Sequence, residues 1–289
     1  MSFLEHDLPL PPGETVESLR KYLSRFRLEV EQDKERIQAE FNNYLREELK
    51  RFLYTINILP ADTGRLLEIG SSPYFTSLLV RRFTHYDLTC SNYFGADHPD
   101  VATQVEVSTK GEREEFVFHN FNIESDSNPF GKDYFDAVLF CEVIEHLTND
   151  PMQALLNIKS MLKPDGHLIL TTPNVNRLEN IARMISGANM YDPYSGYGPY
   201  GRHNREYNKH ELQLLLTHLG FDIEVMFTSD VHENRSDDFC EVYKTLPLVD
   251  FRRSDLGQYV FLRARNATEA NPKKPSWLYR SYPPDELCD

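Results

Sequence analysis

The stretch Tyr134–Asn149, YFDAVLFCEVIEHLTN, decides the fold of the chain. It opens with the apolar run Ala137–Phe140, which is typical of a parallel strand buried on both faces. Glu142, Glu145 and His146 follow directly after this predicted strand. In open α/β sheets, ligands bind outside the carboxyl ends of the strands, so this position predicts a functional site. If the chain becomes helical here, the three side chains stand at i, i+3 and i+4 and share one face.

The composition is that of a globular protein. The chain has 289 residues, of which 40% are hydrophobic and 26% are charged. Its formal net charge of −14 argues against general nucleic-acid binding, because such proteins neutralise phosphates with Lys and Arg. The four cysteines include no CxxC pair, and no export signal is visible, so we expect a reduced, cytoplasmic protein. No apolar run approaches the roughly 20 residues of a membrane span.

Patterns along the chain predict three parts. Residues 1–60 form an N-terminal helical extension, in which Glu14–Tyr54 carries apolar stripes at helical spacing. These stripes predict packing against the next domain, a lid, or a homodimer contact. The main domain covers residues 61–265, and residues 266–289 form a polar C-terminal tail.

The main domain opens like a Rossmann-type unit. A short strand ends at Glu68–Gly70, a turn of small residues follows, and a helix begins at about Pro73. Leu88–Asn92 is a second strand. Gln104–Ser108 and Glu115–Phe121 then alternate in polarity, which predicts a hairpin where a helix is usual.

The rest of the domain alternates helix and strand. The predicted elements are a helix over Met152–Leu162, a strand over His167–Thr171, a helix over Lys209–Leu219, and strands over Phe221–Phe227 and Gln258–Arg265. Between them, residues 186–205 are rich in Gly, Tyr and Pro. A loop of this length inside a compact domain is usually functional, and we expect a lid insertion.

In this order of elements, residues 65–265 resemble the class I S-adenosylmethionine-dependent methyltransferases. The resemblance is carried by LLEIGSS at 66–72, FDAVLFCEVIEHL at 135–147 and LKPDGHLILTTPN at 162–174. It implies an α/β fold with a Rossmann-like seven-stranded sheet whose final hairpin strand is antiparallel.

The resemblance also implies S-adenosylmethionine as cofactor. A close backbone approach is allowed at the turn after the first strand, and an amide can replace the usual acid at the ribose hydroxyls. The implied cofactor-binding residues are Glu68, Gly70, Ser71, Ser72, Asn92, Asn122, Ile123, Cys141 and Glu142. Ser72 and Tyr74 stand where the family has glycines. The alternative interpretation is that Asn92 and Asn122 are turn residues.

Glu142-x-x-Glu145-His146, with His203 in GRHNREY, resembles the metal site of small-RNA 2′-O-methyltransferases. The resemblance implies that Glu142, Glu145, His146 and His203 bind Mg²⁺ or another divalent cation. Glu142, His146 and His203 are then the candidate catalytic residues, because a coordinated hydroxyl becomes more acidic. In the alternative interpretation, His146 only packs and Glu145 caps a helix, as in many members of this superfamily.

The segment GRHNREYNKHEL at 201–212 is similar to methyltransferases of bacterial sugar and polysaccharide modification. A vicinal diol would suit a chelating metal, and Tyr191, Tyr194, Tyr197 and Tyr200 would stack on sugar rings or pack a rigid lid. We therefore expect a metal-assisted O-methyltransferase acting on a sugar or other polyhydroxylated small molecule. The alternatives are a metal-independent enzyme with a His base, an RNA 2′-O-methyltransferase, and a catalytically silent methyltransferase-like binding protein.

Overall fold

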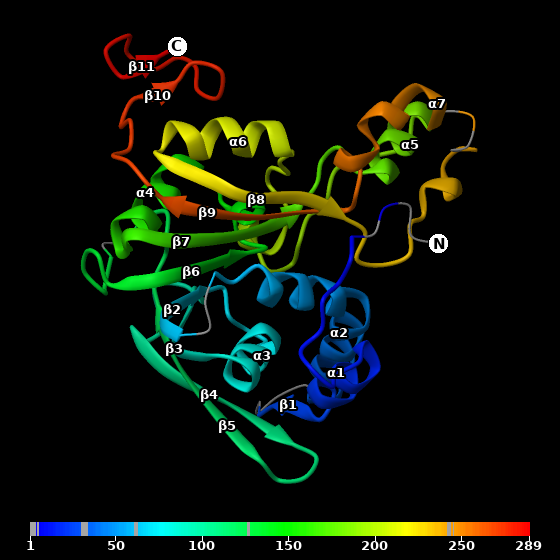
Figure 1. The fold of residues 1–289 in the computed structure, drawn as a ribbon, viewed down its shortest axis with the longest axis vertical. Helices are drawn as coiled ribbons and strands as arrows, with labels where there is room; N and C mark the ends of the chain where they lie inside the picture. Colours follow the sequence, from blue (N-terminus) through cyan, green and yellow to red (C-terminus); the bar gives the residue numbers. More distant parts are fainter. Residues whose placement is uncertain are drawn as a thin grey trace.

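One mixed sheet forms the centre of the computed structural model, which describes residue 4 and residues 6–29, 34–60, 63–125, 128–241, 244 and 246–289. Within these residues the sheet has nine strands in the order β1-β4-β5-β3-β2-β6-β7-β9-β8. The β4–β5 hairpin lies at one end of the molecule, and β8 lies towards the other end beside α6 (Figure 1).

The strands of the main sheet are β1 (Phe26–Leu28), β2 (Thr63–Ile69), β3 (His85–Asn92), β4 (Val101–Ser108), β5 (Arg113–Asn120), β6 (Phe135–Cys141), β7 (Leu162–Pro173), β8 (Phe221–Ser229) and β9 (Tyr259–Asn266). The helices are α1 (Val16–Leu23), α2 (Lys34–Asn57), α3 (Phe75–Phe83), α4 (Pro151–Met161), α5 (Leu178–Ser186), α6 (Lys209–His218) and α7 (Leu246–Val249). Short 3₁₀ turns include η1 (Ile144–His146), η2 (Pro199–Gly201) and η3 (Ser236–Asp238).

The topology confirms the predicted α/β class. Strands β5, β3, β2, β6 and β7 are parallel, and β9 runs antiparallel between β7 and β8. The expected count of seven strands is too low, because β4 and β1 extend the sheet beyond β5. The predicted hairpin is present as β4 and β5, with no helix between β3 and β4.

The central strand β6 is buried on both faces, as its apolar run predicts. Val138 and Phe140 pack with α4 and α6 on one face, whereas Ala137 and Leu139 pack with residues of α2 and α3 on the other. The position of β6 between two helical layers determines where its carboxyl end emerges from the sheet.

The N-terminal extension is not continuous helix. Phe26 and Leu28 alternate with an exposed Arg27, and this short run forms β1 on the edge of β4. In α2, the apolar residues Leu45, Leu49, Phe52 and Leu53 are buried in a cluster shared with α1, α3 and the sheet. The stripe that suggested a dimer contact is therefore used for packing within the chain.

The loop that follows η1 is fixed at both ends. The Glu124 carboxylate accepts hydrogen bonds from the backbone N–H groups of residues 148–150. Asp150 then caps α4 by accepting from the N–H groups of Met152 and Gln153, with Pro151 in the first helical turn. These contacts hold the segment after β6 rigidly against the sheet.

The C-terminal tail packs back on the domain. It forms a two-stranded sheet of β10 (Lys274–Pro275) and β11 (Leu287–Cys288), and the Tyr279 hydroxyl donates to Asp150. No helix in the described part of the chain has the length and apolar character to span a membrane.

Candidate functional site

The segment after β6 does not continue as an α-helix. Glu142 adopts a φ of +56°, and residues 144–146 form the single 3₁₀ turn η1. The prediction that Glu142 shares a face with Glu145 and His146 is therefore wrong. Glu142 turns instead towards β7 and α2, where its Oε1 accepts from Thr171 Oγ1 at 2.9 Å and lies 3.9 Å from Arg51 Nη1.

Glu145, His146 and His203 do come together. Each offers one ligand atom, and these atoms lie within 4.8 Å of one another. Glu145 Oε1 is 3.7 Å from His146 Nε2, and the two imidazole rings are 5.0 Å apart between centroids. Residue 203 lies 57 positions beyond residue 146 in the chain, so the loop after α5 delivers it as the sequence predicts.

The Glu145 carboxyl is fully buried at 0% exposure. Its Oε2 accepts from Thr172 Oγ1 at 2.9 Å, whereas its Oε1 has no hydrogen-bond partner among the described residues. Burial and then the charge of Glu142 raise the pKa of Glu145 to about 8. A buried, unpartnered carboxylate oxygen beside two imidazoles is a donor set that suits a divalent cation.

Each imidazole is oriented by a second contact. His146 Nδ1 lies 3.0 Å from the Arg202 carbonyl oxygen, and His203 Nδ1 lies 3.0 Å from Glu206 Oε1. Both partners accept hydrogen bonds, so Nδ1 carries a proton, and in the neutral form of each ring the Nε2 lone pair remains for a ligand. This tautomer is the one that a metal-binding histidine needs.

The two histidines titrate in opposite directions. Burial lowers the pKa of His146, and the neighbouring His203 lowers it further. Burial also acts to lower the pKa of His203, but the Glu206 hydrogen bond and the charge of Glu145 outweigh it and raise that pKa. At a given pH near neutrality, a larger fraction of His146 than of His203 is therefore in the neutral form.

Glu206 and Arg177 were not predicted from the sequence. Arg177 Nη1 donates to Glu206 Oε2, while the other oxygen holds His203. Burial acts to raise the pKa of Glu206, but the His203 hydrogen bond and the Arg177 charge lower it to about 2. The only sign of this pair in the sequence was that Glu206 follows His203 by three residues.

A second unpredicted group is the buried cation Arg51 on α2, which is 3% exposed. Its Nε donates to Glu48 Oε2 at 2.8 Å, and the other oxygen of Glu48 accepts from Tyr259 OH at 3.0 Å. Arg51 also donates to Tyr44 and lies beside Glu142. The helix α2, from the predicted N-terminal extension, thus reaches the carboxyl end of β6.

A cavity of about 560 Å³ lies at the carboxyl ends of β2, β3 and β6, and we call it the cofactor cavity. This volume is in the range of cofactor and small-molecule sites. Expected residues that line it are Gly70, Ser72, Asn92, Asn122, Ile123 and Glu142. The remaining expected residues, Glu68, Ser71 and Cys141, line a smaller neighbouring cavity of about 30 Å³.

Gly70 is required by the shape of the turn. Its φ is +74°, and a Cβ at this position would lie 2.8 Å from Val143 Cγ2. Val143 lines the cofactor cavity together with Gly70. The missing side chain therefore keeps this wall of the cavity open, as a ligand at close backbone approach requires.

Two polar side chains that were expected to contact the cofactor form hydrogen bonds within the protein. Asn92 Oδ1 accepts from Ser72 N at 3.0 Å, and its Nδ2 donates to Tyr74 OH at 3.2 Å. Glu68 is buried and accepts from Ser77 on α3, and burial raises its pKa to about 7. Asn92 therefore fixes the turn as well as lining the cavity, whereas Glu68 lies beneath the turn.

The predicted lid, residues 186–205, is fixed at its base. Asn204 N donates to the Glu145 carbonyl oxygen at 2.7 Å, and Asn204 Nδ2 donates to that of His146 at 2.9 Å. Tyr200 OH accepts from Asn122 Nδ2 at 2.9 Å, so the loop borders the cofactor cavity. At the tip the tyrosines are exposed, with Tyr194 at 90%.

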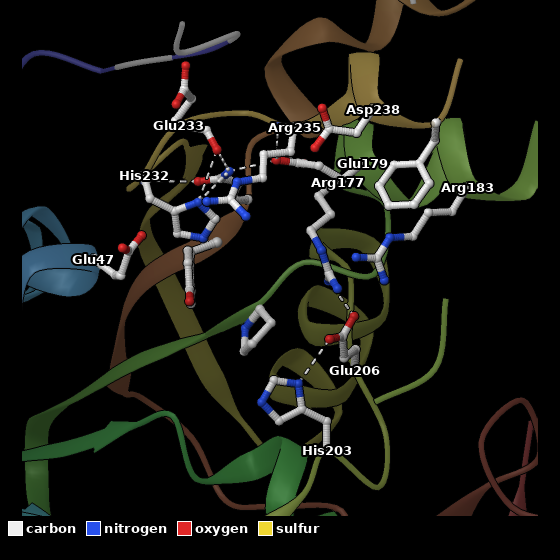
Figure 2. A pocket seen from close by; sticks show the side chains of 14 residues that line it. Glu47, Arg177, Glu179, Arg183, His203, Glu206, His232, Glu233, Arg235 and Asp238 are labelled. Carbon is white, nitrogen blue, oxygen red and sulfur yellow. Dashed lines mark hydrogen bonds and ion pairs between the residues drawn. The ribbon is translucent and has the colours of Figure 1, made fainter. Parts of the chain in front are cut away.

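A second cavity, of about 590 Å³, lies on the other side of His203, and we call it the charged pocket (Figure 2). It is lined by Glu47, Pro173, Arg177, Glu179, Arg183, His203, Glu206, His232, Glu233, Arg235, Asp238, Phe239, Gln258 and Tyr259. His146 lines the cofactor cavity and His203 lines the charged pocket. The pair of imidazoles thus borders both cavities.

Comparison with known proteins agrees with this architecture. Residues 36–225 match the family described as methyltransferase domain. A chain of the complex between the Haloferax volcanii Trm112 methyltransferase activator and a methyltransferase is 10% identical with a TM-score of 0.52, covering 80% of this chain and 95% of that one. A SAM-dependent methyltransferase from Thermotoga maritima is 16% identical with a TM-score of 0.49, covering 80% and 97%. No curated protein sequence matches.

Proposed function

Because the chain belongs to the methyltransferase domain family and is a class I S-adenosylmethionine-dependent methyltransferase, we propose that it methylates a hydroxyl group with the help of a divalent cation. The proposed acceptor is a sugar or another polyhydroxylated small molecule. One observation carries the proposal: the Glu145, His146 and His203 cluster borders both cavities, with His146 lining the cofactor cavity and His203 lining the charged pocket.

The cofactor cavity fits S-adenosylmethionine, whose sulfonium supplies an electrophilic methyl group. Gly70 keeps the cavity open beside the first turn, and Asn122 and Ile123 line its far wall. Asn92 holds the turn in shape through Ser72. These residues would bind and orient S-adenosylmethionine. Tyr200 would help to exclude water from the side of the cavity that the loop 186–205 borders.

The cluster fits a divalent cation, which would act as a Lewis acid and lower the pKa of an acceptor hydroxyl. Glu145 Oε1 and the Nε2 atoms of His146 and His203 would hold it. The support is the unpartnered, buried Glu145 oxygen and the two Nδ1 contacts that leave both Nε2 atoms available. In the proposed site, Glu142 is a charged group near the cluster, and its carboxylate faces Arg51.

The charged pocket supports a polyol acceptor. Carboxylates and guanidinium groups offer acceptors and donors in one cavity, and Phe239 and Tyr259 add aromatic faces. Hydroxyl groups of a sugar can both donate and accept, so they match such a mixed lining. Nearest to the cluster, His203 would face the hydroxyl to be methylated.

A second candidate is metal-independent transfer with a histidine base. It is favoured by the lowered pKa of His146, since a neutral imidazole can accept the proton of the acceptor hydroxyl. In this case His203 and Glu206 would only position the ring of His146.

Metal removal distinguishes the two candidates. We expect exhaustive EDTA treatment and His146→Ala each to abolish methyl transfer to a panel of nucleotide sugars, detected by product mass. Calorimetry with S-adenosylhomocysteine should show an affinity close to that of the wild type. His218→Ala, at the last residue of α6, is the matched control and should keep full activity.

An unchanged rate after EDTA treatment and full metal analysis would refute the metal proposal. The pH–rate profile would then show an acidic limb below the ordinary imidazole pKa of roughly 6.5, because burial lowers the pKa of His146.

A further inference from the structure

We propose that Arg183 and Arg235 in the charged pocket bind an oxyanion of the acceptor, so that the acceptor is an anionic polyol carrying a phosphate or a carboxylate. This inference rests on the proposed function and specifies its substrate class. It concerns the end of the charged pocket that lies away from His203 (Figure 2).

Three arginines line the charged pocket, and their side chains extend into it (Figure 2). Arg177 is compensated, because it donates to Glu206. In the described ranges, neither Arg183 nor Arg235 has a carboxylate as ion-pair partner, although the chain as a whole is strongly acidic. Arg183 is half-buried and Arg235 is exposed, and both guanidinium groups can donate hydrogen bonds to an anion in the cavity.

Arg183 has unused donors. Its guanidinium lies over Phe239 at 4.7 Å from the ring centroid, and its Nη1 makes a long contact of 3.4 Å with the Asn189 carbonyl oxygen. Its Nε is buried and has no partner within the described residues. The aromatic contact keeps the plane of the guanidinium in place, which favours bidentate binding of an oxyanion.

Beside the arginines, Glu179 offers an acceptor. It is 7% exposed, and its Oε1 accepts from Gln258 Nε2 at 2.6 Å. Its Oε2 has no partner within the same described residues. A buried carboxylate oxygen without a donor, on the wall of a cavity, suits a ligand hydroxyl.

The other carboxylates of this end do not exclude an anion. Glu233 and Asp238 are exposed, so water and salt screen their charges, and the half-buried Glu47 pairs with Arg46. Glu206 is neutralised by Arg177 and His203. One end of the charged pocket therefore has the Glu179 oxygen, which can accept a hydrogen bond from a hydroxyl, and two guanidinium groups. The other end has His203 of the cluster. This arrangement matches a ligand with hydroxyls and one anionic group.

The test is calorimetric binding to the full chain saturated with S-adenosylhomocysteine. The probes are glucose 1-phosphate, glucuronate and the neutral methyl glucoside. We expect an anionic probe to bind more tightly than the neutral one. Arg183→Gln and Arg235→Gln should each weaken that binding by about tenfold or more, which is about 1.4 kcal/mol, because each removes a charged hydrogen-bond donor.

Two further variants sharpen the test. Arg183→Lys keeps the charge and should retain part of the affinity. Arg113→Gln removes an exposed arginine on β5, outside the pocket, and should leave the affinity unchanged. Tight binding of glucose 1-phosphate alone identifies a phosphate, and tight binding of glucuronate alone identifies a carboxylate.

Equal affinity of the wild type for all three probes, or anion binding that survives both Gln substitutions, would overturn the inference. Methylation of neutral sugars in that case would leave the proposed function intact. Conversely, arginine-dependent anion binding without metal-dependent methyl transfer would support the anion site and refute the proposed function.

Discussion

Replacement of the buried Arg51 by Met should destabilise the fold by about 3–5 kcal/mol. Met retains most of the apolar stem but removes the guanidinium that Glu48 contacts at 2.8 Å and Glu142 at 3.9 Å. Removal of one partner from a buried ion pair costs roughly this amount, because the remaining charge stays buried without compensation. Urea unfolding followed by circular dichroism measures the loss.

The same variant carries a pH signature. Burial raises the pKa of Glu142, and the Arg51 charge opposes this rise. Without Arg51 the folded-state pKa should rise further above the unfolded value. A carboxyl with a raised folded-state pKa contributes stability that is present below its unfolded pKa and lost as the pH rises through the folded pKa. The deficit of the variant should therefore be largest near pH 8 and shrink towards pH 5.

Arg46→Met is the matched control on the same helix. Arg46 is exposed and pairs with Glu47 at the surface, so its loss should cost less than about 1 kcal/mol. If Arg51→Met costs no more than this control, or if its deficit does not change with pH, then Arg51 does not compensate buried carboxylates and the explanation fails.

Gly70→Val should abolish binding of S-adenosylhomocysteine in calorimetry, because a Cβ would lie 2.8 Å from a neighbouring methyl group; Gly131→Val, at a similar positive φ but with open space around it, should bind normally. Unchanged affinity in a folded Gly70→Val protein would remove this glycine from the site. Residues 191–205 should gain hydrogen-exchange protection when S-adenosylhomocysteine and an acceptor bind, and equal protection in both states would argue against a moving lid. Glu124→Ala should cost about 1–3 kcal/mol in urea unfolding, since the N–H groups of residues 148–150 lose their acceptor, and a smaller loss would mean that water replaces it.

The order of strands and helices could be predicted because burial leaves a periodic pattern. Ala137–Phe140 is apolar on both faces, and the structure buries it on both faces. The meeting of His146 and His203 was expected from the resemblance of ExxEH and the later histidine to the metal site of small-RNA 2′-O-methyltransferases. The short strand β1 was missed, because three residues are too few to show a period against the helical pattern around them.

The detailed geometry of the site could not be predicted. The direction of Glu142 depends on its positive φ, which no local signal in the sequence encodes for a non-glycine residue. Arg51 occurs in a run of charged residues on α2, and nothing in that run distinguishes the buried cation from its exposed neighbours. Such roles follow from tertiary packing, which brings distant charges together only after the sheet has formed.

The anchoring of Asn204 on the Glu145 carbonyl oxygen has a consequence for how the enzyme can diversify. The loop has one end held by α5 and the other held at the cluster, while the residues around Tyr194 project into solvent. Insertions, deletions or exchanges at this tip would leave both attachment points in place. The tip is thus a segment that can change by mutation or by loop grafting without altering the geometry of the Glu145, His146 and His203 cluster.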